Sequence, residues 1–128
     1  MTMYIADTHA LVWHLARDDR LGKNARKILD DADLGGTEIV VPTIVLAEAL
    51  YISRKVNVRF DDMMDSIQNA RNYSAYPLGV NIVSTMRKLG TEYSIHDAVI
   101  VATAKILDAP VITRDEAIRR IGDVKVVW

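Results

Sequence analysis

Short apolar runs alternate along the chain with longer segments in which apolar residues recur at helical spacing. The short runs predict strands at 3–6, 38–41, 76–78, 110–113 and 124–127. The longer segments predict helices at 8–17, 21–32, 43–53, 61–70, 82–89, 95–107 and 115–120. Strands that alternate with helices favour an α/β fold, in which helices cover both faces of a central parallel sheet.

Local signals refine several of these elements. The glycines at 35–36 stop the second helix, and Asp61 is placed to cap the fourth. The segment 95–107 is apolar almost all round, which predicts a helix that is buried on every side. The basic stretch 54–60 connects the third and fourth helices, which we expect to form an antiparallel pair.

Composition predicts one globular domain over residues 1–128. Apolar residues make up 50% of the chain, and 16 Lys and Arg stand against 17 Asp and Glu. The net charge of −1 argues against a polycation that coats nucleic acid but leaves nucleic acid open as a substrate. Cysteine is absent, which excludes a disulfide scaffold, a Cys-based zinc site and a cysteine nucleophile. No apolar run approaches the roughly 18 residues of a membrane span, and no signal peptide is visible, so we expect a cytoplasmic protein.

Four carboxylates occupy positions where such a fold places its chemistry. Asp7 follows the first strand, Asp115 follows the fourth, and Asp97 begins the apolar helix. Sites of open parallel sheets lie at the carboxyl ends of the strands, so these three acids are expected at one edge. Glu48 stands among apolar neighbours in the third helix, where an unpaired charge is costly and requires a partner.

Two interpretations of these acids remain open on the residues alone. The aspartates also suit helix starts, where they cap the helix or complement its dipole, and Glu48 could pair with an arginine. Converging carboxylates, by contrast, repel one another unless a divalent cation lies among them. Oxygen ligands without cysteine would select Mg²⁺ or Mn²⁺.

Four motifs, in order along the chain, carry a resemblance to a known family. They lie at 4–13 (YIADTHALVW), 45–50 (VLAEAL), 96–104 (HDAVIVATA) and 111–115 (VITRD). The chain resembles PIN-domain nucleases, and in particular the small VapC-type toxins of prokaryotic toxin–antitoxin pairs. Each motif is short, but their order, their spread over the chain and the strand–helix alternation all agree with the family.

The resemblance implies a fold, a site and a reaction. The fold would be a PIN-like three-layer sandwich around a central parallel sheet. The catalytic and metal-binding acids would be Asp7, Glu48, Asp97 and Asp115. Thr8 or Thr113 would supply the hydroxyl often found beside them. The activity would be that of an endoribonuclease, in which a water activated by Mg²⁺ or Mn²⁺ attacks the phosphodiester and leaves 5′-phosphate and 3′-hydroxyl ends.

Candidate substrate contacts lie on the first helix and just after it. His9 and Trp13 could stack on a base, although packing is the other interpretation of both. Arg17 and Arg20 could hold phosphates, although a solvated surface also suits them. We expect His14 to be a surface residue, and three histidines without metal-ligand spacing predict no zinc site.

The third and fourth helices carry more apolar residues than a helical pair on a small sheet needs to bury. Leu50, Tyr51, Phe60 and Met64 are among them, and an exposed surplus would mark an interface. In VapC-type relatives a comparable helical pair helps to form the dimer and a groove for the antitoxin. The resemblance therefore implies a homodimer and a VapB-type antitoxin partner. Complete burial of these side chains within one monomer is the alternative.

The main alternative function is a catalytically silent PIN-like module that binds RNA or protein. Loss of the acids would indicate it, and all four are present. Three other classes of similar plan lack residues that they need. A response regulator needs an aspartate after the third strand, a Rossmann domain needs a glycine-rich first turn, and a dehalogenase-type phosphatase needs an aspartate where His9 stands.

Overall fold

The computed structural model describes residues 1–56 and 58–128, and its elements follow the expected alternation. The strands are β1 (Met3–Ala6), β2 (Glu38–Pro42), β3 (Tyr73–Tyr76), β4 (Val111–Ile112) and β5 (Val126–Val127). The helices are α1 (Thr8–Leu15), α2 (Lys23–Asp33), α3 (Thr43–Ser53), α4 (Phe60–Asn69), α5 (Val80–Met86), α6 (Ile95–Leu107) and α7 (Glu116–Ile121). The predicted connection at 54–60 includes Asn57, which lies outside the described residues.

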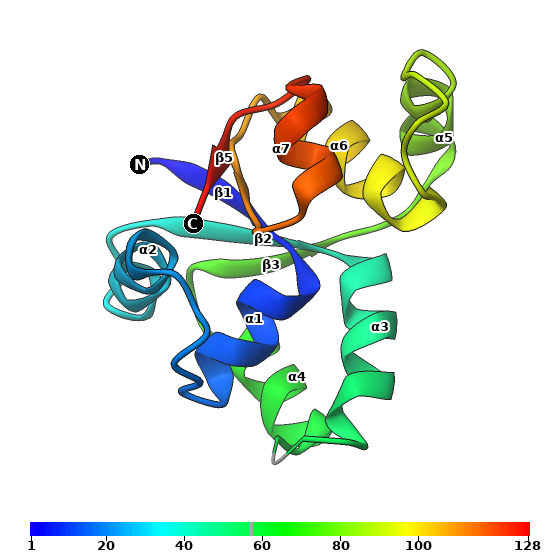
Figure 1. Cartoon of the computed structure of the whole chain (residues 1–128). Coiled ribbons are helices and arrows are strands. Elements are labelled where there is room, and N and C mark those ends of the chain that lie inside the picture. Colours follow the sequence, from blue (N-terminus) through cyan, green and yellow to red (C-terminus); the bar gives the residue numbers. More distant parts are fainter. Residues whose placement is uncertain (57) are drawn as a thin grey trace.

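The strands of the described residues form one parallel sheet in the order β3-β2-β1-β4-β5. Ile5 of β1 pairs with Val40 on one side and with Val111 on the other, so β1 lies at the centre. Helices α1 to α4 cover one face of the sheet, and α5 to α7 cover the other (Figure 1). The predicted α/β sandwich with a central parallel sheet is confirmed.

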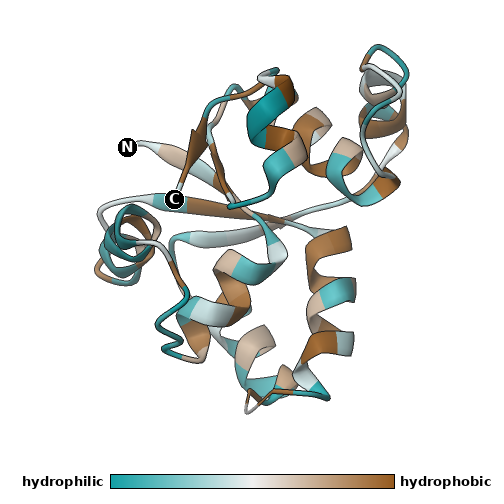
Figure 2. Ribbon diagram, in the orientation of Figure 1, coloured by the Kyte–Doolittle hydropathy of each residue, from teal (hydrophilic) through white to brown (hydrophobic). Residues whose placement is uncertain are grey.

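Apolar residues are dense in β2, whereas β3 is pale in the hydropathy colouring (Figure 2). Ile5 and Ile112 are fully buried at the centre of the sheet, because helices exclude water from both of its faces. The middle of the α6 helix is enclosed in the same way. Ile100 packs into the main core, whereas Val99 packs against Ile82 of α5 on the other side of the helix. The predicted burial is confirmed for residues 98–104, whereas Ile95 and Ile106 at the two ends of the helix are exposed.

The third strand lies earlier in the chain than its apolar pattern predicts. It runs over Tyr73–Tyr76 and not over 76–78. In the parallel ladder with β2, Ile39 pairs with Tyr73 and Pro42 pairs with Tyr76. Pro77 has no backbone N–H with which to continue the ladder, so the strand ends before it.

Two helix boundaries also differ from expectation. The α1 helix ends at Leu15. Two residues after that end, Arg17 adopts a left-handed conformation with φ of 54°, which turns the chain away from the helix axis. The α4 helix begins at Phe60 after Arg59, and no side chain caps it, so the predicted capping role of Asp61 is wrong. Among the helices of the described residues, none combines the length and the apolar character that a membrane crossing requires.

Candidate active site

The candidate site lies where the chain leaves the carboxyl ends of the two central strands. After β1 the chain enters α1 on one face of the sheet, and after β4 it enters α7 on the other face. Such a divergence between adjacent parallel strands opens a crevice, and open α/β sheets bind their ligands there. Asp7 follows β1 directly, and Thr113 follows β4 directly, so both residues line this crevice.

Asp7 is held from two sides and is 8% exposed. Its Oδ1 accepts a hydrogen bond from the Thr8 backbone N–H at 2.6 Å, which makes Asp7 the N-cap of α1. Its Oδ2 accepts a hydrogen bond from the Thr113 hydroxyl at 2.5 Å. Burial raises the pKa of the Asp7 carboxyl above its ordinary value, although these hydrogen bonds oppose the shift. The capping interpretation of Asp7 is therefore correct, and it leaves the metal interpretation open.

Asp97 and Asp115 share the electrostatic environment of Asp7. Burial, and then the negative charges of Asp115 and Asp7, raise the pKa of the Asp97 carboxyl. Asp115 caps α7 by accepting a hydrogen bond from the Ile118 N–H at 2.9 Å. Its own N–H donates to the Thr113 hydroxyl at 2.9 Å, so one threonine links Asp7 to Asp115. Three of the four predicted acids thus interact at one edge of the sheet.

Glu48 joins this group through a histidine and not through an arginine. Its Oε2 lies 3.3 Å from Nε2 of His96, and 40% of its side chain is exposed. The same His96 nitrogen lies 3.2 Å from the Thr8 hydroxyl, and the other ring nitrogen lies 3.9 Å from Asp97 Oδ1. Sequence reasoning drew nothing from His96, although its position directly before Asp97 was the available signal.

A pocket of about 230 Å³ opens beside the acids. Asp7, Thr113 and Asp115 line it. His9, Arg114 and Trp128 line it as well. Arg114 and Trp128 were not predicted as site residues. Arg114 lies between Thr113 and Asp115 in the fourth motif, and that position was the signal for its place in the site. Nothing local in the sequence marks Trp128.

Trp13 lies behind this pocket and does not face solvent. Only 4% of the residue is exposed, so its ring is not presented to a substrate base. The ring packs 5.0 Å from His9 and 5.9 Å from Trp128, measured between ring centroids. The guanidinium groups of Arg114 and Arg20 lie 4.3 Å and 4.5 Å from the centroid of the Trp13 ring. Trp13 therefore supports a group of side chains at the pocket.

The two predicted phosphate contacts on the first loop are both paired with carboxylates. Arg17 donates to Asp30 Oδ1 at 2.9 Å, and Arg20 donates to Asp18 at 2.7 Å. The hydrogen bonds from Arg20 lower the pKa of the Asp18 carboxyl to about 2. Neither arginine lines the pocket beside the acids.

The prediction that His14 is a surface residue is wrong. Its side chain is 2% exposed, and Nε2 lies 2.8 Å from Asp33 Oδ2. Among the described residues, His14, Asp30 and Asp33 are the side chains whose potential metal-ligand atoms lie within 4.8 Å of one another. They belong to α1 and α2, away from the four predicted acids. The acids at the sheet edge do not meet that spacing in this structure.

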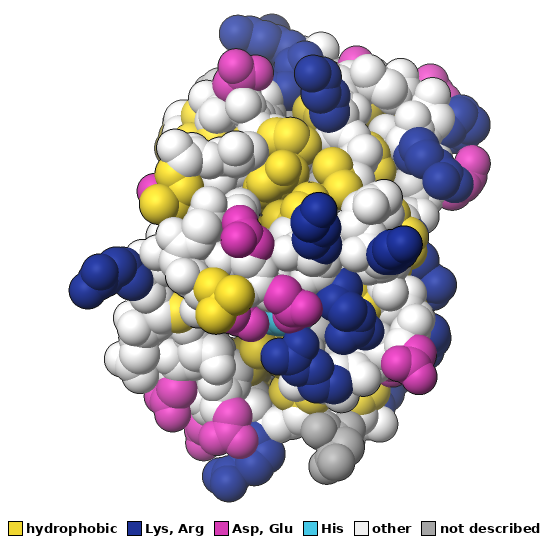
Figure 3. Space-filling model, turned by 90° about the vertical axis from the view of Figure 1, so that its left-hand side faces the viewer, with side chains coloured by type: hydrophobic (Ala, Val, Ile, Leu, Met, Phe, Trp, Pro, Cys, Tyr) yellow, Lys and Arg dark blue, Asp and Glu magenta, His cyan; other side chains and the backbone are white. Residues whose placement is uncertain are grey.

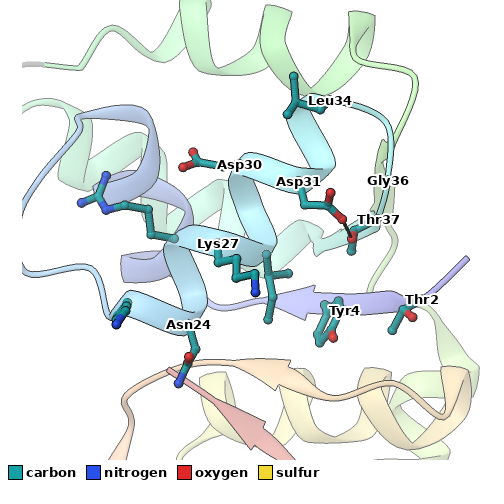
Figure 4. Close-up of a pocket in the computed structure, with 12 residues that line it drawn as sticks. Thr2, Tyr4, Asn24, Lys27, Asp30, Asp31, Leu34, Gly36 and Thr37 are labelled. Atoms are coloured by element: carbon teal, nitrogen blue, oxygen red, sulfur yellow. Dashed lines mark hydrogen bonds between the residues drawn. The ribbon is translucent and has the colours of Figure 1, made fainter.

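A larger cavity of about 870 Å³ lies at the other end of the sheet (Figure 4). It is lined by α2 and by the residues that begin β1 and β2, with Tyr4 and Lys27 among them. In its wall the Thr37 hydroxyl donates to Asp31 at 2.5 Å. None of the predicted catalytic acids reaches this cavity, so it is not the candidate active site.

The predicted interface residues differ in exposure. Tyr51 is 65% exposed, whereas Leu50, Phe60 and Met64 are partly buried. Outside the predicted interface, α5 and the start of α6 also carry exposed large apolar residues. Val80 is 82% exposed, and Ile95 is 74% exposed.

The donor set at the sheet edge fits a hard divalent cation. Its members offer carboxylate and hydroxyl oxygens, which are the ligands that Mg²⁺ and Mn²⁺ prefer. Burial raises the pKa of the Asp7 and Asp97 carboxyls, and the negative charges of Asp115 and Asp7 add to the shift at Asp97. A positive charge among them would relieve both effects.

Comparison with known proteins places this geometry in a family. The structure is similar to VapBC2 from Rickettsia felis, solved with promoter DNA, at 16% identity over 98% of both chains with a TM-score of 0.70. It is similar to VapC20 of Mycobacterium tuberculosis, described as a toxin that cleaves the sarcin-ricin loop, at 17% identity over 98% of this chain and 99% of that one, with a TM-score of 0.70. It is also similar to FitAcB from Neisseria gonorrhoeae, at 18% identity over 98% of this chain and 97% of that one, with a TM-score of 0.69.

At such identities these three likenesses establish the fold alone. No curated protein sequence matches the chain. The sequence model of the PIN domain, in contrast, matches residues 4–124, which is nearly the whole chain. This chain belongs to the PIN domain family.

Proposed function

We propose that this protein is a metal-dependent endoribonuclease and the toxin of a type II toxin–antitoxin pair. The observation that carries the proposal is the group of Asp7, Asp97 and Asp115 at the divergence of β1 and β4 in a PIN fold. Membership of the PIN domain family and the VapC-type structural neighbours support nuclease activity. Its RNA substrate would place its action in the cytoplasm.

The three aspartates and Glu48 would hold the cation in this proposal. When bound, Mg²⁺ or Mn²⁺ would lower the pKa of the attacking water and offset negative charge on the scissile phosphate and the leaving oxygen. The Thr113 hydroxyl fixes the orientation of Asp7, because it donates to Asp7 and accepts from the Asp115 N–H. Thr8 contributes its backbone N–H to Asp7 and its hydroxyl to His96.

Glu48 and His96 act as a pair at the side of this site. His96 Nε2 lies between Glu48 Oε2 and the Thr8 hydroxyl, so the imidazole fixes where the glutamate carboxylate points. Glu48 is partly exposed and therefore remains accessible to solvent and substrate. We assign Glu48 as a catalytic residue and His96 as the residue that positions it.

Arg114 is the best-placed cation for the RNA backbone. It is exposed, lines the pocket beside Asp7 and packs on the buried ring of Trp13. A guanidinium there would hold a phosphate next to the acids, which a polyanionic substrate requires. His9 and Trp128 line the same pocket and offer ring surfaces for a base. Of the four residues first expected to contact substrate, His9 is the one that lines this pocket.

The proposed partners are an antitoxin and a second copy of this chain. Several structural neighbours are toxin–antitoxin complexes, which supports an antitoxin partner of the VapB type. Tyr51 and the partly buried Leu50, Phe60 and Met64 remain the proposed interface. We expect Tyr51→Glu to lower the mass in solution at micromolar concentration, measured by light scattering. A wild-type monomer at that concentration would contradict the dimer.

Cleavage of RNA in Mg²⁺ and in EDTA tests the proposed activity directly. The wild type should cut RNA in Mg²⁺, leave 5′-phosphate ends and lose activity in EDTA, and Asp7→Asn should be inactive under both conditions. Binding of RNA without any cleavage in Mg²⁺ or Mn²⁺ would favour the silent PIN-like module. Full metal-dependent cleavage in Asp7→Asn would refute the catalytic role of Asp7.

A further inference from the structure

A second group of potential metal ligands joins α1 to α2, away from the sheet edge. His14 lies in the last turn of α1, and Asp30 and Asp33 lie three residues apart on one side of α2. His14 Nε2 is 2.8 Å from Asp33 Oδ2, and His14 Nδ1 is 3.8 Å from Asp30 Oδ1. On the face that shows α2, acidic and basic side chains meet around a small exposed area of histidine (Figure 3).

The histidine at the centre of this group is not fully satisfied. Its side chain is 2% exposed, yet Nδ1 is buried without a hydrogen-bond partner. Asp30 Oδ1 faces that nitrogen at 3.8 Å, which is too far for a hydrogen bond. Nδ1 is therefore a buried nitrogen with a free lone pair beside the Asp30 carboxylate, and it is available to a ligand.

Neighbouring side chains hold the two carboxylates in place. Tyr73 donates its hydroxyl hydrogen bond to Asp33 Oδ1 at 3.0 Å, which leaves the other oxygen of Asp33 directed at His14. Asp30 and Asp33 are 44% and 42% exposed, so an ion can reach the group from solvent.

We propose that His14, Asp30 and Asp33 bind a divalent transition-metal ion of the Zn²⁺ type. One imidazole nitrogen and two carboxylate oxygens, completed by water, form a donor set that Zn²⁺ and Co²⁺ accept and that Mg²⁺ does not favour. A ligand-to-ligand spacing near 3.3 Å follows from metal–ligand distances of about 2.0–2.1 Å. One potential ligand atom from each of the three residues lies within 4.8 Å of the other two, so side-chain rotations would bring them to that spacing.

The ion would connect α1 to α2 across the loop between them. Arg17 competes with it, because its guanidinium donates to Asp30 Oδ1 at 2.9 Å. Removal of that positive charge should therefore strengthen metal binding. This proposal does not depend on the nuclease activity, because it uses none of the residues at the sheet edge.

Titration of the purified protein with ZnCl₂ by calorimetry tests the site. The Asp97→Asn variant serves as the background, since it weakens binding at the sheet edge. In this background we expect one equivalent of Zn²⁺ to bind at His14, Asp30 and Asp33. Asp30→Asn and Asp33→Asn should each weaken Zn²⁺ binding at least ~10-fold, and Arg17→Gln should strengthen it. With CoCl₂, the bound ion should give visible absorption bands that Asp30→Asn reduces.

Asp31→Asn is the matched control, because Asp31 neighbours Asp30 on α2 but points toward Thr37 in Figure 4. It should leave Zn²⁺ affinity unchanged. Asp30 is exposed, and its replacement by asparagine keeps the side-chain volume, so the fold should survive the test. Equal Zn²⁺ affinity in the background, Asp30→Asn and Asp33→Asn proteins would overturn the proposal. Complete loss of Zn²⁺ binding in Asp97→Asn alone would overturn it as well.

Discussion

The acidic sheet edge and the histidine group formed by His14, Asp30 and Asp33 bring carboxylates together in two different ways. At the sheet edge, Asp7, Asp97 and Asp115 interact through like charge, and burial and repulsion raise the pKa of Asp7 and of Asp97. In the histidine group, each carboxylate has a partner, since Arg17 pairs with Asp30 and the Tyr73 hydroxyl donates to Asp33. The sheet edge thus places like charges together, whereas the histidine group places each carboxylate beside a donor.

This difference predicts different ions and different roles. Repulsion among the acids predicts that the sheet edge binds a hard cation, and a site that gains charge stabilisation only on binding would suit chemistry on a polyanion. The histidine group already has partners for its carboxylates, so an ion there replaces existing contacts and mainly connects two helices. Variants that affect one region and leave the other unchanged therefore test this difference.

The largest expected effect is that of Asp97→Asn. RNA cleavage should fall at least ~100-fold, because a main electrostatic element of the site is lost. Without metal, the variant should melt no lower than the wild type, because repulsion from Asp7 and Asp115 is relieved. Most of the Mg²⁺-dependent rise in melting temperature should disappear, since a ligand that binds only the folded state stabilises it by mass action.

Thermal melts with EDTA, Mg²⁺ and Zn²⁺ measure these effects in one series. Stabilisation by Zn²⁺ at the histidine group should persist in Asp97→Asn, which would separate the two regions. A variant that retains full Mg²⁺-dependent cleavage would refute the assignment of Asp97.

Glu48→Gln should have the next largest effect, with cleavage lowered by about 10–100-fold. Its free energy of unfolding should change by less than about 1 kcal/mol, because the Glu48–His96 contact is partly exposed and solvent screens it. Glu116→Gln is the matched control, since Glu116 is exposed and pairs with Arg119 on its own helix. Urea unfolding and cleavage are measured on the same preparations. A large loss of stability with activity per folded molecule retained would make Glu48 a structural residue.

The sequence predicts the acidic edge better than the histidine group, for a physical reason. The strand–helix alternation fixes which residues follow β1 and β4, so Asp7 and Asp115 fall at one edge whatever the details of packing. The contact between His14 and α2 depends instead on how two helices rotate against each other. Helical spacing alone does not determine that rotation, and the predicted surface position of His14 was wrong for this reason.

The positions of β3, His96 and Trp128 also depend on contacts between segments that are distant in the sequence. The position of β3 follows from its ladder with β2, and local hydropathy at 76–78 does not contain that information. His96 was visible beside Asp97, but its contact with Glu48 joins α3 to α6 and needs the folded chain. Trp128 reaches the pocket because β5 pairs with β4 at the edge of the sheet.

A smaller effect is expected for Arg114→Gln, which tests the cation beside the acids. Loss of one phosphate contact should weaken RNA binding at all sequences and reduce the slope of log affinity against log salt by about 0.7 for a single strand. Arg119→Gln removes an exposed arginine that pairs with Glu116 away from the pocket, and it serves as the control. Binding is measured in an Asp7→Asn background at several salt concentrations. Equal slopes for the two variants would remove Arg114 from the substrate path.

The smallest predicted effect is a pH dependence of stability that belongs to the sheet edge. The pKa values of Asp7 and Asp97 are raised above the ordinary 3.8, so above pH 3.8 the folded state holds more protons than the unfolded chain. The contribution of these groups to stability is therefore greatest below pH 3.8, falls as pH rises through their raised pKa values, and then stays constant. Asp18 acts in the opposite direction, but its pKa of about 2 places its contribution below this window.

Urea unfolding in EDTA between pH 4 and 8 measures this slope. Asp97→Asn should flatten it, because one of the two carboxyls with a raised pKa no longer titrates. Saturating Mg²⁺ should remove the fall at neutral pH, because the bound cation favours the ionised acids. If the wild type and Asp97→Asn show the same slope in EDTA, the acids at the sheet edge do not repel one another in solution, and the contrast with the histidine group disappears.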